Sequence, residues 1–208
     1  MALKQKYNHQ ADAIASYDFV DISSGTGYIN YYLGTTVDVN VISNLTFYSN
    51  TVFTQSSRIA ADTYTKMLDL DFDVLINKPT VFKGQGIVNV PIAVYHDDSA
   101  VWGYVIIKMR KWDGTTETEI IENTSSVVSA TNTIAYLMTA TDLQVPSTQF
   151  KKGETLRFTI EGWAKATTPA AGVAPYMRIG HDPKARATGW DATVPSLLNA
   201  QLPVRIDL

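Results

Sequence analysis

The sequence predicts an all-β fold, a jelly-roll-like β-sandwich of roughly eight to ten strands. Three observations support this prediction. Apolar and polar residues alternate over several segments, turn residues separate these segments, and no stretch has the periodicity of a helix of normal length. No repeat of about 20–50 residues is visible, which argues against a propeller or solenoid. Long connections such as 180–195 suit loops that cross between sheets better than a simple meander.

The chain of 208 residues divides into two parts. Residues 1–16 are polar and aperiodic, so we expect an extended N-terminal arm rather than a helix. Residues 17–208 are expected to form one β-sandwich domain, because all-β domains of this size are often single.

Two segments alternate most clearly. In 67–76, Leu68, Leu70, Phe72, Val74 and Ile76 share one face, and Asp69, Asp71 and Asp73 share the other. In 155–165, apolar residues likewise alternate with Arg157, Thr159, Glu161 and Lys165. Weaker strand patterns cover 37–53, 81–83, 87–95, 131–140, 176–179 and 201–208. Pro91 suggests a sheet edge or bulge, and a single helical turn is plausible only in 56–64.

A β-hairpin is predicted over 101–123, with Asp113-Gly114 as a two-residue type I′ loop. This loop would place Trp112 opposite Thr115, Arg110 opposite Glu117, and Lys108 opposite Glu119. Met109 would face Thr118 and Ile107 would face Ile120. Opposite charges would then share the solvent face, with an apolar pair on the other.

Composition excludes several classes of function. Apolar residues make up 45% of the chain and the net charge is −3, which offers no electrostatic basis for binding nucleic acid. No apolar run approaches the roughly 20 residues that span a bilayer, so no membrane partner is expected. The first residues lack a signal-peptide pattern. With no cysteine there is no disulfide or thiolate metal site. We therefore expect a protein made in a cytoplasm.

Two residue groups could carry metal chemistry. Asp69, Asp71 and Asp73 have a spacing suited to oxygen ligation of a divalent ion, but the glycine and glutamate of a calcium loop are missing, which favours a solvated acidic face. Of the histidines His9, His96 and His181, the last two precede aspartates at turns, and loop capping is favoured over metal ligation.

No nucleophile–base pattern, phosphate loop or metal cluster is visible. We therefore expect no enzyme, no cofactor and no metal. A glycosidase needs only two carboxylates, but nothing in the sequence singles out such a pair.

Aromatic residues provide the remaining candidate site. Trp102 and Trp112 fall on the charged face of the hairpin strand, and Trp163 falls on the polar face of its strand. Together with Trp190, Tyr28, Tyr31 and Tyr32, they could stack on a sugar or contact a partner. Burial by another subunit is favoured over ligand binding, because aromatic residues are enriched at interfaces.

Four phrases, DFDVLINKPTVFKGQGIVNVPI, FKKGETLRFTIEGWAK, GHDPKARA and LPVRIDL, resemble virion structural proteins of tailed bacteriophages. The resemblance spans about residue 15 to the C-terminus and is to β-sandwich decoration (cement) or minor capsid proteins. It implies no catalytic residues.

The resemblance implies a decoration protein that binds the major capsid protein as a homotrimer, stabilises the head, and lies on the capsid exterior after assembly in the host cytoplasm. The arm 1–16 would attach to the shell. The alternative function is a carbohydrate- or receptor-binding β-sandwich module of a phage tail. A glycan-degrading enzyme is a third, weaker option.

Overall fold

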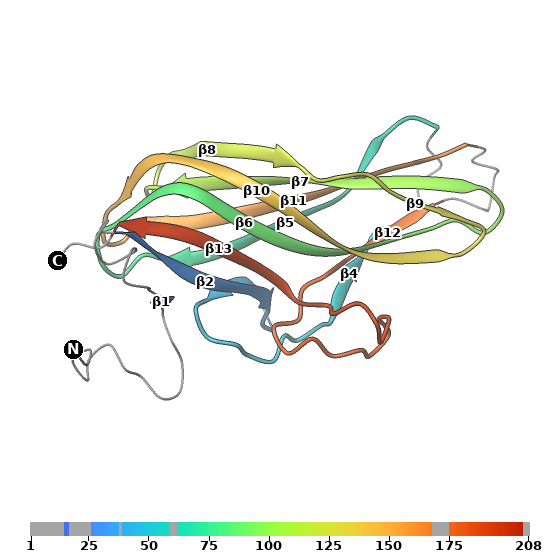
Figure 1. Cartoon of the computed structure of the whole chain (residues 1–208), viewed down its shortest axis with the longest axis horizontal. Helices are drawn as coiled ribbons and strands as arrows, with labels where there is room; N and C mark the ends of the chain where they lie inside the picture. The colour runs from blue at the N-terminus through green and yellow to red at the C-terminus, as the bar shows by residue number, and fades with distance from the viewer. Residues whose placement is uncertain (1–14, 17–25, 38, 59–61, 168–174, 206–208) are drawn as a thin grey trace.

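A computed structural model describes residues 15–16, 26–37, 39–58, 62–167 and 175–205. The described residues form thirteen strands and no helix, so the all-β prediction is confirmed. The strands form one continuous sheet that folds into two layers (Figure 1).

The first layer consists of seven main strands. Its hydrogen-bonded order is β4 (Phe53–Gln55), β12 (Tyr176–Gly180), β6 (Thr80–Tyr95), β13 (Leu198–Arg205), β2 (Thr26–Thr35) and β3 (Asn40–Ser43). The long strand β10 (Ile134–Phe150) pairs with the other edge of β6, and β1 (Ala15–Ser16) pairs with β2. The last two residues of the predicted arm thus pair with the sheet, while residues 1–14 lie outside the described part of the chain.

The second layer contains the remaining five strands. Its order is β5 (Thr65–Leu75), β11 (Thr155–Ala166) and β7 (Ala100–Trp112), with β8 (Glu117–Thr124) and β9 (Val128–Thr131) both on the far edge of β7. A single parallel pair, Val41 with Asp73, links β3 to β5 and joins the layers.

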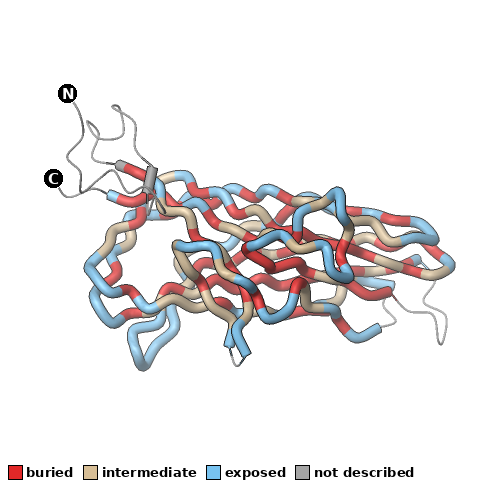
Figure 2. Tube along the Cα trace, turned by 90° about the horizontal axis from the view of Figure 1, so that it is seen from below, coloured by how far each residue is buried: buried red, intermediate tan, exposed pale blue. Residues whose placement is uncertain are grey.

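The core lies between the layers, where the inward faces of their strands meet. Phe72, Phe82, Phe150 and Phe158, from four different strands, are completely buried. The layers approach so closely that a Cβ on Gly103 in β7 would lie 2.6 Å from Cγ1 of Val94 in β6. Figure 2 shows buried residues running along the strands and exposed residues gathered at many of the connections.

Pro91 does not mark a sheet edge or a bulge, because β6 is an interior strand with partners on both sides. It pairs with Met138 of β10. On the other side, Ile92 is the last partner of β12 and Asn89 the first partner of β13. Pro91 therefore lies in the gap between two short strands. The described residues of 56–64 contain no helical turn.

The hairpin forms, but its predicted register is wrong. Trp112 pairs with Glu117 and Arg110 with Glu119, and a bulge shifts Met109 opposite Ile121. The loop spans four residues because the Asp113 carboxylate accepts hydrogen bonds from the backbone N–H groups of Thr115 (2.9 Å) and Thr116 (2.8 Å). These bonds hold an Asx-type turn instead of a type I′ turn and lower the pKa of Asp113 to about 2.

Gly114 keeps the positive φ that the turn needs, at 103°. We expect Gly114→Val to destabilise the fold by about 1–3 kcal/mol, because a β-branched residue is strained in this region. Chemical denaturation measures the change, and Thr118→Val, at an exposed position in β8, is the matched control. Equal stability of the two variants would contradict the strain.

Candidate binding surfaces

The outward face of the second layer carries some of the aromatic residues that the sequence singled out, whereas Tyr28, Tyr31 and Tyr32 lie on β2 of the first layer, with Tyr31 buried. Strand alternation points Trp102 and Trp163 outward, as predicted, and both are half-buried. Trp112 is 36% exposed at the other end of β7, and Trp190 is buried. Only two of the four tryptophans therefore lie at one site.

Four rings form what we call the aromatic surface: Tyr64, Trp102, Tyr104 and Trp163. Tyr104 and Trp163 are register partners on β7 and β11, with ring planes within 3° of parallel and centroids 6.5 Å apart. Tyr64 packs edge-on against Tyr104, at 4.9 Å. The Lys165 ammonium lies over the rings of Tyr64 and Trp102, at 4.7 and 5.6 Å. The sequence did not single out Tyr64 or Tyr104, and it placed Lys165 only on the polar face of its strand.

Glu161 fixes the aromatic surface from one side. Its side chain is only 8% exposed and accepts a hydrogen bond from Nε1 of Trp163 at 3.1 Å. Lys108 lies 3.1 Å from the same carboxylate and Lys66 lies 3.6 Å away. Burial alone would raise the pKa of Glu161, but the Trp163 hydrogen bond and Lys108 outweigh burial and lower it. The charged carboxylate therefore holds the indole in one orientation.

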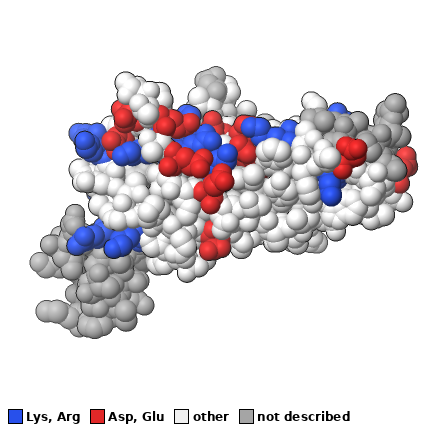
Figure 3. Space-filling model, turned by 90° about the horizontal axis from the view of Figure 1, so that it is seen from above, with Lys and Arg blue, Asp and Glu red and all other residues white. Residues whose placement is uncertain are grey.

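The three aspartates of β5 point outward along the same face, and each binds a neighbouring side chain. Asp69 pairs with Lys66 at 2.7 Å. Asp71 accepts a hydrogen bond from Thr159. Asp73 accepts hydrogen bonds from Nε and from a terminal nitrogen of Arg157, both at 2.8 Å. Figure 3 shows acidic and basic groups intermixed on the upper face. Among the described residues, no three His, Asp or Glu side chains are arranged to hold a metal ion.

A second surface, which the sequence did not predict, lies on the loops of the first layer. Four apolar side chains in 36–48, here called the loop surface, are strongly exposed: Val37 (83%), Val39 (58%), Leu45 (42%) and Tyr48 (73%). In Figure 1 these loops and the loop 181–197 lie at the lower side of the molecule, away from β8 at the top. The only available sequence signal was the presence of apolar residues between polar turn residues.

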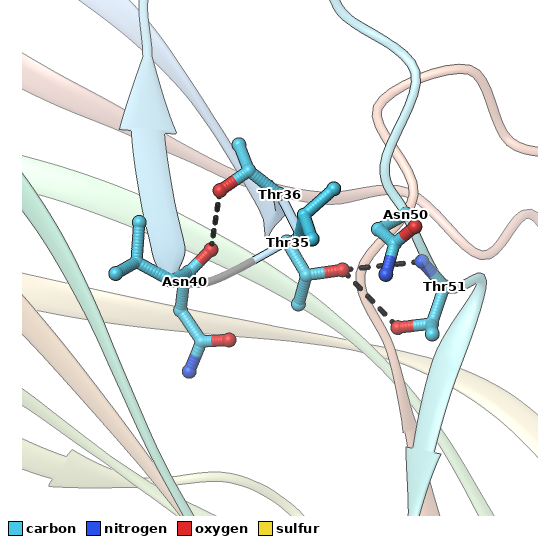
Figure 4. Close-up of a pocket in the computed structure, with 7 residues that line it drawn as sticks. Thr35, Thr36, Asn40, Asn50 and Thr51 are labelled. Carbon is cyan, nitrogen blue, oxygen red and sulfur yellow. Dashed lines mark hydrogen bonds between the residues drawn. The ribbon is translucent and has the colours of Figure 1, made fainter.

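A shallow hollow of about 320 Å³ adjoins the loop surface (Figure 4). Its lining residues are Thr35, Thr36, Val37, Val39, Asn40, Asn50 and Thr51. The hydroxyls of Thr35 and Thr51 are hydrogen-bonded at 3.1 Å, and Thr36 Oγ1 donates to the Val39 carbonyl at 3.1 Å. Three of the hydroxyls in the hollow therefore already have hydrogen-bond partners within it. The lining residues supply hydroxyl and amide groups but no charged side chain.

Asp182 fastens the loop 181–197 to the loop 44–52. Its carboxylate is fully buried and accepts hydrogen bonds from Nε of Arg186 at 2.6 Å and from the backbone N–H of Lys184 and Arg186. It also accepts from the backbone N–H of Ser49 at 3.4 Å. Burial would raise the pKa of Asp182, but these hydrogen bonds, led by Arg186, lower it. Lys184 and Arg186 then lie over the Tyr48 ring, at 5.7 and 5.6 Å.

The two described histidines differ from each other. His96 caps its loop as predicted, because its Nδ1 accepts the backbone N–H of Asp98 and of Ser99, each at 3.0 Å. For His181 the prediction is wrong, because the neighbouring Asp182 does the capping. His181 is instead fully buried and bonded through Nε2 to Thr54 Oγ1 at 2.9 Å. Burial lowers its pKa to about 4, which makes it a poor base for the Thr54 hydroxyl. His9 lies outside the described residues.

The described residues include no helix with the length and hydropathy of a membrane span. No protein-family model and no curated protein sequence matches the chain.

Solved structures do match its fold. An aminopeptidase from a marine sediment archaeon (Thaumarchaeota) has a TM-score of 0.51 at 9% identity, with 88% of this chain aligned to 37% of the enzyme. An α-amino acid ester hydrolase also gives 0.51, at 10% identity, with 85% aligned to 36%. A CocE/NonD family hydrolase from Staphylococcus aureus gives 0.49, at 11% identity.

These matches contradict the expectation that the chain is not an enzyme, since two structures that share its fold are hydrolases. The expectation depended on the absence of catalytic motifs from the sequence. A domain can lack such motifs and still share its fold with a domain of an enzyme. The chain spans only slightly more than a third of the length of these hydrolases, 36–37%. At 9–10% identity, the likeness shows the fold alone.

Proposed function

We propose that the chain is a structural protein of a tailed-phage virion, a decoration protein that docks onto the assembled head through its loop surface. The observation that carries this proposal is the exposure of Val37 (83%) and Tyr48 (73%) on neighbouring loops. Clustered exposed apolar residues with a polar surround are typical of protein–protein contact sites. The resemblance of four sequence phrases to virion structural proteins names the class of partner, the major capsid protein.

The packing around Tyr48 supports docking through a preorganised surface, whose side chains are positioned before the partner binds. Lys184 and Arg186 lie over the ring, at 5.7 and 5.6 Å from its centroid, and Asp182 fixes their loop. An aromatic side chain that is already ordered loses little conformational entropy when a partner covers it. Tyr and Arg are also the residue types enriched among those that dominate interface energy. The loop surface therefore has the composition of a docking anchor.

Docking through the loops gives the molecule an orientation on the shell. In Figure 1 the loops are on the lower side and β7 and β8 on the upper side. A protein attached by its loops would leave β7 and β8 away from the capsid. Its place would then be the capsid exterior, and many copies binding only the assembled lattice would stabilise it by mass action.

Mutation of the loop surface tests the proposal. We expect Val37→Ser combined with Tyr48→Ala to weaken co-sedimentation with expanded phage heads by at least about tenfold, the loss of one interface anchor. Val127→Ser is the matched control, because Val127 is 52% exposed on a different connection. Full binding by the double variant, or an equal loss in the control, would contradict docking through these loops.

We also propose that the free protein is a homotrimer, since decoration proteins of the class it resembles are typically trimeric and exposed apolar residues favour association. Light scattering at micromolar concentration should give three times the chain mass of 22.9 kDa. A mass equal to that of one chain would exclude the trimer.

A further inference from the structure

The geometry of the aromatic surface points to a sugar-binding site: the rings of Tyr104 and Trp163 form a stacking platform for a neutral saccharide. This site goes beyond shell docking and does not depend on it, because it lies on the second layer and the loop surface lies on the first.

The platform is ordered before any ligand binds. Tyr104 and Trp163 project from paired positions on two adjacent interior strands, with parallel planes. Tyr64 supports one ring edge-on, and Glu161 holds the indole N–H of the other. Rings fixed in this way lose little entropy on binding, which favours a flat ligand that lies against their faces.

The charges around the platform favour a neutral ligand. Lys66 and Lys108 are paired with Asp69, Glu122 and Glu161. Lys165 already fills the cation position over Tyr64 and Trp102, at 4.7 and 5.6 Å. A cationic ligand would have to displace this ammonium, and an anionic ligand would meet carboxylates among the lysines.

The same surroundings favour a saccharide over a protein segment. A protein interface that covered the rings would also have to remove water from the charged groups beside them, which is costly. A sugar ring has a C–H face that can lie on an aromatic ring and hydroxyls at its edge. Those hydroxyls can accept from lysine ammonium groups and donate to carboxylates, so the charged groups exchange water for hydrogen bonds.

The test uses the full chain and neutral oligosaccharides of glucose, galactose and N-acetylglucosamine as probes. Saturation-transfer NMR and calorimetry should detect binding of at least one series, and sulfated or sialylated counterparts should bind more weakly. Tyr104→Ala should weaken binding about tenfold, consistent with the loss of one aromatic contact. Trp112→Ala is the control, because Trp112 also points outward from β7 but lies at its far end.

Tyr104→Leu provides a second variant that keeps apolar volume without the flat ring, in case the alanine variant fails to fold. It too should lose binding, while its melting temperature shows that the fold remains. The proposal is overturned if the unmodified chain binds none of the three series at millimolar concentration. It is also overturned if Tyr104→Leu binds normally, if Trp112→Ala loses as much, or if anionic sugars bind more tightly.

Discussion

Lowering the pH from 7 to 4.5 should reduce the free energy of unfolding by about 2–3 kcal/mol through His181 alone. Burial lowers the pKa of this imidazole from 6.5 to about 4 in the folded chain. As the pH falls, His181 therefore binds its proton at a higher pH in the unfolded chain than in the folded chain. The free energy of unfolding decreases between pH 6.5 and 4. Each unit of difference corresponds to about 1.4 kcal/mol. Denaturant titrations at several pH values measure the slope.

The surroundings of His181 explain why it stays neutral. Nε2 faces the Thr54 hydroxyl from β4, and the ring packs against Phe72 of β5, with centroids 6.0 Å apart. The charged group beside it is the adjacent Asp182 carboxylate, whose attraction raises the His181 pKa less than burial lowers it.

His181→Gln keeps a group that can bond to Thr54 but cannot titrate. We expect this variant to lose most of the pH dependence above pH 4.5, whatever its stability at pH 7. Carboxylates with lowered pKa values, such as Asp182 and Glu161, lose their stabilising charge only at lower pH. Between pH 7 and 4.5 the change in stability is therefore assigned to the histidine. An unchanged slope in His181→Gln would show that another group titrates.

Asp182→Ala should destabilise the fold by about 2–4 kcal/mol, because it removes a buried carboxylate that satisfies several donors. The backbone N–H groups of Ser49, Lys184 and Arg186 would lose an acceptor, as would the Arg186 guanidinium. The Arg186 side chain is 35% exposed and can turn to water, which keeps the loss below that of a fully buried ion pair. Thermal or chemical unfolding measures the change.

Asp191→Ala is the control for this substitution. Asp191 sits in the same loop and accepts backbone hydrogen bonds from Thr193 and Val194, but water can replace it there. The loss should therefore be clearly smaller than for Asp182→Ala. Two equal losses would mean that the loop contributes through its general order, and that burial of the Asp182 carboxylate has no special role.

The strands of the fold could be predicted where one face is buried and the other wet. Leu68 to Ile76 and Leu156 to Ala164 alternate in sequence because each strand packs its apolar face on the core, and the structure confirms both strands. In β11, however, Thr159 and Glu161 on the polar face are also buried. The hairpin register could not be predicted, because the side chain of Asp113 selects the turn and a bulge at Met109 absorbs a residue. Neither effect produces a periodic pattern in the sequence.

The candidate sites were harder to predict because they depend on long-range pairing. Trp102 and Trp163 were recognised as outward-facing, but their proximity, and the pairing of Tyr104 with Trp163, follow from the register of β7 with β11. Tyr48 lies in a turn-rich segment, and its exposure depends on how two loops pack around Asp182. The burial of His181 likewise depends on contacts with strands more than 100 residues away in sequence, such as β4 at Thr54.

The most direct test of the proposed function is cryo-electron microscopy of the phage particle with which the chain co-purifies. We predict density for the β-sandwich on the outside of the head, with the loops around Val37 and Tyr48 against the capsid and the face of β7 and β11 toward solvent. Absence of the chain from the head, or attachment through β7 and β11 with the loops pointing outward, would contradict the account.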